Sequence, residues 1–292
     1  MISLLLQTVG WMCGISGRRF RRVFGGLLGR VMMLADRSRL AVTLGNLDSA
    51  FPEKSMDWKR RTARAAYRNL GITFAEIAAF PWISDARIRQ LVVYDNLDLL
   101  TGKYRENRGM MLLSGHFGNW ELLAYSAGLF TGIPVAIIVK PQRNRRIDAL
   151  LNANRTRAGN SVIPFDNAAR AIISTLKNGG AVAMLADQAA DADRDIFVEF
   201  FGRAAATYEA PAALALRLNV PVIIGFAVRQ AKGDYRVRLE EIPHDDLTYS
   251  PAGVAELTRR HVAALERAVR ENPEQWAWQH KRWKYAPKNE PE

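Results

Sequence analysis

The chain lacks the residues and motifs on which several large enzyme classes depend. Its 292 residues include one cysteine, Cys13, so the chain cannot form an internal disulfide or a cysteine-based zinc site. Its four histidines are scattered and no His-Glu-x-x-His motif is present, which disfavours a metal site. The Gly-x-Ser-x-Gly elbow, the Walker loop and the Gly-x-Gly-x-x-Gly fingerprint are also missing. Serine hydrolases, P-loop nucleotidases and Rossmann dehydrogenases are therefore disfavoured.

Acidic residues are scarce relative to basic ones. The chain has 29 Asp and Glu against 41 Lys and Arg, which gives a formal net charge of +12. A positive surface of this size favours an anionic partner, and nucleic acid, an anionic membrane and an acidic carrier protein all qualify. Because 49% of the residues are hydrophobic, the chain can build a sizeable core as one large domain or two small ones.

The N-terminus lacks an apolar run long enough to cross a membrane. Residues 1–17 are mostly apolar but interrupted, and they fall short of the ~20 residues that a spanning helix needs. Positive charge follows this stretch, whereas a secretory signal carries it in front. Apolar residues beside arginines are typical of an interfacial membrane anchor, although a buried helix with a solvated basic end is the alternative. The arginines expected to face the membrane are Arg18, Arg19, Arg21 and Arg22.

Composition and periodicity divide the chain into two regions. Residues 1–45 form a basic, apolar arm that holds seven Arg and one Asp, half of the net charge. Residues 46–292 alternate between short apolar runs and amphipathic segments, which predicts a single α/β domain with a largely parallel, mixed sheet flanked by helices. Strands are expected at 110–113, 135–139, 162–164, 181–185, 222–228 and 235–241. Helices are expected at 55–80, 120–130, 166–177, 211–218 and 253–270, with Ser55 and Asp166 as N-caps.

The best clue to chemistry is the segment Ser-Gly-His-Phe-Gly-Asn-Trp-Glu at 114–121. His116 and Glu121 stand five residues apart, which places them roughly 140° apart on a continuous helix, too far to share a site. They converge if His116 ends a strand, Gly115 and Gly118 allow a tight turn, and Glu121 opens the next helix. A histidine oriented by a carboxylate near helix N–H groups suits general-base acyl transfer.

A general-base mechanism explains why the chain needs no nucleophile of its own. His116 would accept the proton of a substrate hydroxyl, and Glu121 would fix its tautomer and stabilise the imidazolium. Backbone donors near Gly118 and Asn119 would hold the oxyanion. Asn119 is also a candidate helix cap.

Two further segments carry candidate binding residues. The stretch 140–157 is rich in Lys and Arg, which indicates either a solvated basic helix face or recognition of phosphates. Asp187 and Gln188 follow the apolar run 181–185, and a carboxylate at the end of a parallel strand is often functional. Helix capping is the alternative explanation for Asp187.

An ordered set of motifs over nearly the whole chain resembles the late acyltransferases of lipid A biosynthesis, the lauroyl/myristoyl transferase family. The His-x4-acidic motif is shared with all glycerolipid-type acyltransferases, but the ordered set is more specific. It comprises Asn46-Leu47, Phe51-Pro52-Glu53, the block 115–121, the arginines before Gly159, Asp187-Gln188, Phe200-Phe201-Gly202 with Thr207, Val220-Pro221-Val222, and Trp276 to Trp283.

The resemblance implies a fold and an activity. It predicts a glycerolipid-acyltransferase-like enzyme at the cytoplasmic face of the inner membrane, associated with anionic lipids. The enzyme would transfer a fatty acyl group from acyl carrier protein to a hydroxyl of a phosphorylated lipid A precursor, with neither a metal nor an organic cofactor. His116 and Glu121 would be catalytic. The expected substrate-binding residues are Gly118, Asn119, Lys140, Arg143, Arg155, Arg157, Asp187, Gln188, Gly202 and Thr207.

The sequence leaves two other interpretations open. One is an acyltransferase that acts on another membrane glycolipid or on an amino-acid lipid, since the motifs do not fix the acceptor. The other is a non-catalytic basic protein that binds membranes or nucleic acid. No basic strand interleaved with aromatic residues and no recognition helix supports nucleic acid as a partner.

Overall fold

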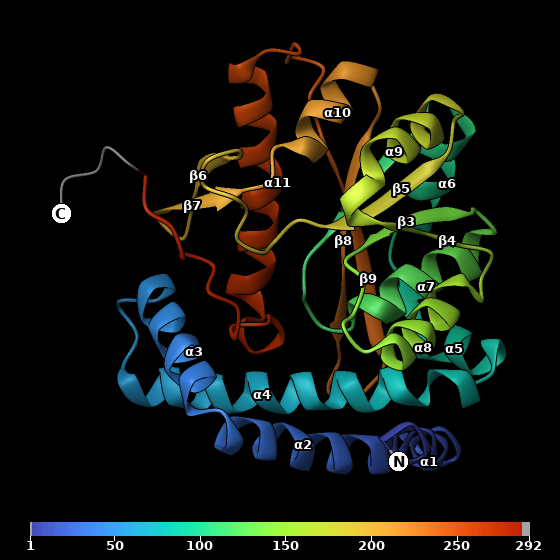
Figure 1. Cartoon of the computed structure of the whole chain (residues 1–292), viewed down its shortest axis with the longest axis vertical. Coiled ribbons are helices and arrows are strands. Elements are labelled where there is room, and N and C mark those ends of the chain that lie inside the picture. The colour runs from blue at the N-terminus through green and yellow to red at the C-terminus, as the bar shows by residue number, and fades with distance from the viewer. Residues whose placement is uncertain (1, 288–292) are drawn as a thin grey trace.

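A seven-stranded sheet lies at the centre of the computed structural model, which describes residues 2–287 (Figure 1). The strand order is β1-β9-β8-β2-β5-β3-β4; β8 and β9 are antiparallel and all other neighbours are parallel. This mixed, mostly parallel sheet confirms the predicted α/β class. The strands are β1 (Val92–Tyr94), β2 (Met110–Ser114), β3 (Val135–Val139), β4 (Ser161–Pro164), β5 (Ala181–Leu185), β8 (Val222–Arg229) and β9 (Tyr235–Ile242).

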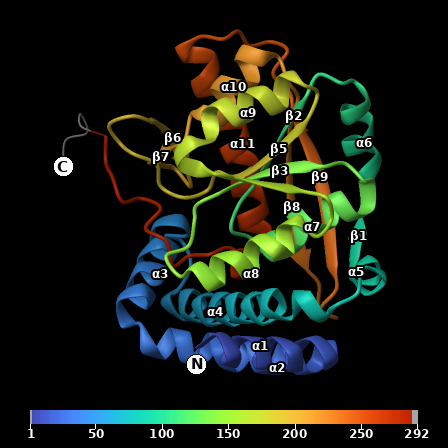
Figure 2. The ribbon, with the colours of Figure 1, turned by 45° about the vertical axis from the view of Figure 1, so that its right-hand side comes forward.

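Helices cover both faces of the sheet, and a hydrophobic cluster fills each interface. Successive residues of a strand point to opposite faces, so Met110 enters one cluster and Met111 enters the other. One face packs against α5 (Asp85–Leu91), α6 (Leu97–Arg105) and α7 (Trp120–Thr131). The other packs against α9 (Ala168–Lys177), α10 (Ala210–Leu218) and α11 (Pro251–Glu271), while α8 (Arg145–Thr156) lies beside α7 (Figure 2).

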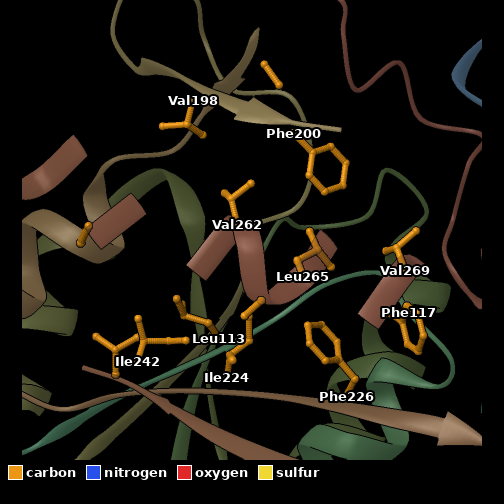
Figure 3. Close-up of a cluster of buried hydrophobic side chains, with 14 of the residues drawn as sticks. Leu113, Phe117, Val198, Phe200, Ile224, Phe226, Ile242, Val262, Leu265 and Val269 are labelled. Carbon is orange, nitrogen blue, oxygen red and sulfur yellow. The ribbon is translucent and has the colours of Figure 1, made fainter. Parts of the chain in front are cut away.

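The long helix α11 builds much of the second cluster. Figure 3 shows Val262 and Leu265 of α11 lying over Leu113 and Ile224 of the sheet, with Val269 farther along the helix. All five side chains are buried. The predicted helix at 253–270 is confirmed, and Val262, Leu265 and Val269 lie three and four apart, on one side of the helix.

The predicted elements between residues 55 and 270 are confirmed, with one error at a helix start. Ser55 caps α4 (Met56–Ala79) as expected, since its hydroxyl accepts a hydrogen bond from the backbone of Trp58. The prediction of Asp166 as a helix cap is wrong, because the short 3-10 helix η2 (Phe165–Asn167) precedes α9 and holds this residue. Two further 3-10 helices are η1 (Phe80–Trp82) and η3 (Pro273–Gln275).

A two-stranded hairpin lies outside the main sheet and was not predicted. Its strands are β6 (Ile196–Phe200) and β7 (Arg203–Thr207), joined by a tight turn at Phe201 and Gly202. Both turn residues have a positive φ. Phe200 and Phe201 are buried in the hydrophobic core. The run Phe-Val-Glu-Phe-Phe-Gly contains the turn glycine but has no asparagine or aspartate to mark a hairpin.

The N-terminal residues form three helices that pack around α4, namely α1 (Ile2–Ile15), α2 (Arg18–Ala35) and α3 (Arg37–Ala50). In both ribbon views α2 runs alongside α4 on the side away from the sheet (Figures 1 and 2). The contact is close because glycines face it: a Cβ on Gly29 would lie 2.1 Å from the carbonyl oxygen of Tyr67. The predicted boundary at residue 45 falls inside α3. The outer ends of the two predicted regions, residues 1 and 288–292, lie outside the described residues.

The outward face of α2 carries large apolar side chains beside the exposed Arg30. Val23, Leu27, Val31 and Leu34 are 59% to 65% exposed, and their spacing places them on one side of the helix. Between residues 2 and 287, no helix combines the length and hydropathy needed to cross a bilayer. The helix therefore turns glycines toward α4 and leaves several large apolar side chains exposed.

Candidate active site

The site lies where two central strands end side by side. β2 and β5 are parallel neighbours, and Ser114 pairs with Leu185 at their carboxyl ends. His116 and Asp187 each follow two residues beyond this pair, so the fold brings them together although they are 71 positions apart. The expectation that both residues occupy the carboxyl edge of the sheet is confirmed.

Asp187 holds His116 through two contacts. The imidazole Nδ1 lies 2.8 Å from Oδ1 of Asp187, and the backbone N–H of His116 donates to Oδ2 at 2.7 Å. The indole N–H of Trp276 also donates to Oδ2, at 2.9 Å. The Asp187 side chain is 1% exposed, whereas that of His116 is 26% exposed. Asp187 thus selects the tautomer with the proton on Nδ1, and Nε2 remains the basic nitrogen.

The two groups shift each other's pKa in opposite directions. Burial lowers the pKa of His116, but the charges of Asp187 and Glu121 and the hydrogen bond to Asp187 outweigh burial, so the pKa is raised. For Asp187, burial raises the pKa, and the contacts with His116 and Trp276 bring it below its usual value. The pair therefore favours an ionised carboxylate beside a histidine of increased basicity.

The expected contact between Glu121 and His116 is absent, and the hydrogen-bond partner of His116 in the structure is Asp187. Glu121 does lie in the first turn of α7, as predicted. Its carboxylate forms a two-pronged pair with Arg155 of α8, with bonds of 2.8 Å from Nε and 2.5 Å from Nη2. The reason is geometric, since the guanidinium fork occupies both carboxylate oxygens. Glu121 acts on His116 through its charge, which raises the pKa of the imidazole.

The amides expected to hold an oxyanion already have protein acceptors. The N–H of Gly118 donates to the carbonyl of Gln275 at 2.8 Å, and that of Asn119 donates to the carbonyl of Ala227 at 3.4 Å. Asn119 is fully buried and caps α7 through the N–H of Leu122. Both amides are therefore engaged within the protein. Gly118 has φ +55°, and a Cβ on it would lie 1.9 Å from the Ala227 carbonyl, so this turn requires glycine.

The other predicted binding residues divide into those near the site and those that hold the fold. The side-chain nitrogen of Gln188 lies 3.4 Å from both ring nitrogens of His116. Lys140 and Arg143 are exposed in the segment that follows β3. The remaining three make contacts within the fold. Arg157 donates to the carbonyls of Phe80 and Ile83, and Gly202 forms the hairpin turn. Thr207 is buried and accepts a hydrogen bond from Arg282.

Sequence reasoning missed the direct contribution of the C-terminal segment. Besides Trp276, the imidazole of His280 is brought to this edge, where its Nε2 accepts from the backbone N–H of Ala189 at 3.0 Å. The bond from the Ala277 N–H to the His116 carbonyl holds the segment in place. The tryptophan-rich ending marks the segment as unusual, but spacing alone does not place it against a residue 160 positions earlier. Within residues 2–287, no group of three His, Cys, Asp or Glu side chains is arranged to hold a metal ion.

Comparison with known proteins identifies the family. The family model for bacterial lipid A biosynthesis acyltransferases matches residues 1–285. The chain belongs to that family. It is 26% identical to the lipid A biosynthesis palmitoleoyltransferase of Escherichia coli over 256 residues, which cover 87% of this chain and 81% of the relative. It is 23% identical to the lauroyltransferase of the same organism over 265 residues, 90% of this chain and 85% of the relative.

A third relative, the lipid A biosynthesis acyltransferase of Haemophilus influenzae, is 26% identical over 174 residues. That match covers 59% of this chain and 53% of the relative. The suspected family resemblance is therefore confirmed, and the chain is a member of an acyltransferase family.

Proposed function

We propose that this acyltransferase moves a fatty acyl group from the thioester of acyl carrier protein to a hydroxyl of a lipid A precursor. Family membership supports the reaction class and the pathway. The observation that carries the mechanism is the His116–Asp187 pair, with a buried carboxylate behind a partly exposed imidazole. The two Escherichia coli relatives are named for different acyl groups, so the acyl length of this enzyme is left open in the proposal.

In the proposed reaction His116 is the general base. Its Nε2 takes the proton of the acceptor hydroxyl while the oxygen attacks the thioester carbon. The carbon–sulfur bond then breaks, and the proton passes from the imidazolium to the departing thiolate. Asp187 keeps Nδ1 protonated and stabilises the positive charge that develops on the ring. Base catalysis of this kind contributes typically ~10²–10⁴-fold to a rate.

Glu121 and Arg155 have a supporting role in this proposal. Each side chain is 11% exposed, so their ion pair is largely shielded from solvent. It joins the first turn of α7 to the last turn of α8 beside the histidine. The pair fixes the helix entry next to His116, and the Glu121 charge increases the basicity of the imidazole.

The anionic partners are proposed to bind on the basic side of this edge. Four basic residues that follow β3 are exposed, in a segment that begins at the same edge of the sheet as His116: Lys140, Arg143, Arg145 and Arg146. An acidic carrier protein and a phosphorylated acceptor both match this charge. No cofactor is required by the proposed steps.

Membrane association is proposed to occur through the outward face of α1 and α2. Trp11, Met12 and Ile15 of α1, the helix that precedes α2, are also exposed. Exposed apolar patches of this kind, with arginines nearby, suit an anionic lipid surface such as the cytoplasmic leaflet of the inner membrane. Arg19 is exposed, but the expectation for Arg21 is not met, because Arg21 is buried and donates to the carbonyls of Cys13 and Ser16 at the end of α1.

The test of the proposed function is a transfer assay with defined lipids. The purified protein would be incubated with acyl-carrier-protein thioesters of different chain lengths and with phosphorylated disaccharide lipids. Mass analysis would then detect an acceptor heavier by one acyl group. His116→Ala serves as the control for contaminating activity. Transfer only to other glycolipids or to amino-acid lipids would contradict the proposed acceptor.

A further inference from the structure

A buried polar network on α4 holds the turn that carries His116. Its centre is the carboxylate of Glu76, on which three donors converge. Arg229 of β8 donates to Oε1 at 2.6 Å, and Asn119 of the turn donates to Oε2 at 2.9 Å. The hydroxyl of Tyr235 on β9 also donates to Oε2. The side chains of Glu76 and Arg229 are only 12% and 7% exposed.

Thr73, one helical turn before Glu76, makes the second contact with the turn. Its hydroxyl donates to the carbonyl of Gly118 at 2.8 Å and accepts from Nη2 of Arg229 at 2.8 Å. The Nε of the same guanidinium donates to Asn69 of α4 at 2.7 Å. The three guanidinium nitrogens of Arg229 thus all donate to α4, and α4 in turn holds both residues that connect Phe117 to α7.

Asn119 has no freedom to reverse its side-chain amide. Its Oδ1 accepts from the N–H of Leu122 and caps α7, so its nitrogen must face Glu76. On the opposite side of the turn, Gln275 accepts from the N–H of Gly118 through its carbonyl and bonds to the backbone of Arg229 through its side chain. The turn is therefore fixed by α4 on one side and by the C-terminal segment on the other.

We propose that Glu76 is a positioning residue for His116, acting through Asn119 and Gly118. This inference rests on the proposed acyl transfer. Only an acceptor satisfies all three donors at this position, and the carboxylate provides two acceptor oxygens. If the turn shifts, the imidazole moves relative to Asp187 and to the bound thioester. A misplacement of about 1 Å in such a site is enough to cost about 100-fold in rate.

The first test is Glu76→Gln. The amide places an N–H₂ group against donors and leaves at least one of them unpaired. We expect kcat to fall about 100-fold, with KM changed by less than about threefold, because substrate-contacting groups are intact. A spectroscopic readout independent of activity is the Nδ1 proton of His116 in nuclear magnetic resonance. With four histidines in the chain, His116→Gln assigns this signal.

In the wild-type protein we expect this proton to be shifted downfield and slow to exchange with solvent, since it is hydrogen-bonded to buried Asp187. In Glu76→Gln it should exchange faster. Glu266→Gln is the matched control: Glu266 accepts from the N–H of Phe201 at 2.6 Å and pairs with Arg270, away from the turn. This control loses the same charge and should keep both kcat and the His116 signal.

A double variant separates positioning from a general loss of stability. When Glu76→Gln is combined with Asn119→Asp, the new carboxylate caps α7 and accepts from the amide introduced on α4. The donor and acceptor are thereby exchanged and the net charge of the pair is kept. We expect partial recovery of kcat and of the slow-exchanging His116 proton.

Each outcome decides between the explanations. If Glu76→Gln keeps its kcat and the slow Nδ1 exchange, the positioning role is refuted. It is also refuted if Glu266→Gln and Glu76→Gln lower the melting temperature equally and lose the same amount of activity. A double variant whose kcat is no higher than that of Glu76→Gln refutes it as well. Absence of acyl transfer in the wild-type protein would refute the proposed function instead, and the exchange measurement would still test the positioning of His116.

Discussion

The carboxyl edge of the sheet and the outer face of α2 depart from the usual distribution of polar and apolar groups, in opposite senses. At the sheet edge a charged carboxylate is buried, since the Asp187 side chain is 1% exposed. On α2, large apolar side chains such as Leu27 and Val31 lie in the open. Buried charges and exposed apolar patches are the departures that most often carry function.

The difference lies in where the compensating partners are found. Both oxygens of Asp187 have donors within the chain, from His116 and Trp276, so the buried charge is satisfied without any ligand. The apolar stripe of α2 has no such cover within the described residues, because its side chains are 59% to 65% exposed. The buried charge is satisfied within the chain, whereas the apolar stripe is left exposed, as the proposed membrane contact requires. Chemistry and membrane binding should therefore be separable by mutation.

The strongest test of this separation is His116→Ala. Without the base we expect acyl transfer to fall about 100- to 10,000-fold. Binding to vesicles that contain anionic lipid should not change, because α4 lies between the turn that follows His116 and α2, and the stripe is on the exposed side of α2. Parallel transfer and vesicle-sedimentation assays measure both effects. A loss of vesicle binding would show that the two regions are not independent.

Asp187→Asn should be nearly as severe, with a distinctive pH profile. An asparagine in the place of a triad aspartate costs about 10,000-fold, and we expect on the order of 1,000-fold here. The raised pKa of His116 makes the rate rise with pH as the imidazole loses its proton. Removing the Asp187 charge lowers this pKa, so the rising limb of the kcat profile should move to lower pH.

The same pairing also affects folding, with a defined sign. Because the folded-state pKa of His116 is raised, its contribution to the free energy of unfolding is fully present below the unfolded pKa and is lost as pH rises through the folded value. Denaturant titrations across this window should show that loss in the wild-type protein and much less of it in Asp187→Asn. An identical pH dependence in both proteins would contradict the pairing.

The α2 surface is tested by replacing Val23, Leu27, Val31 and Leu34 together with serine. Each replacement is expected to remove about 1 kcal/mol of transfer free energy into lipid, so the four together should lower vesicle partitioning about 1,000-fold. The melting temperature should change little, because these groups are exposed in the folded chain. A control variant changes the separate exposed residues Val93, Phe165 and Tyr249 to serine and should keep its partitioning. Equal losses in both variants would point to non-specific binding.

The smallest effect is expected for Glu121→Gln. This change removes one charge that raises the pKa of His116 and weakens the pair with Arg155, yet the Asp187 contact remains. We expect kcat to fall about tenfold, in line with the loss of one shielded charge-assisted bond of about 1.5 kcal/mol. Steady-state kinetics beside Asp187→Asn would rank the two carboxylates. A larger loss for Glu121→Gln would make Glu121 the more important partner.

Local sequence patterns were enough to predict the class of fold and the position of the histidine. Apolar runs such as 181–185 fix buried strands, and amphipathic spacing fixes helices such as α11, since these signals depend only on neighbours along the chain. The glycines around His116 predict the strand-turn-helix junction for the same reason. The hairpin β6–β7 escaped prediction because its short strands resemble any core segment.

What the sequence determined by itself was the set of elements, the excess of positive charge and the residue type suited to base catalysis. Only the tertiary structure decided which carboxylate meets His116. Spacing favoured Glu121, five residues away, but the parallel pairing of β2 with β5 brings Asp187 within hydrogen-bond distance, and Arg155 engages Glu121. Contacts between distant segments follow from strand order and helix packing, which short sequence patterns do not encode.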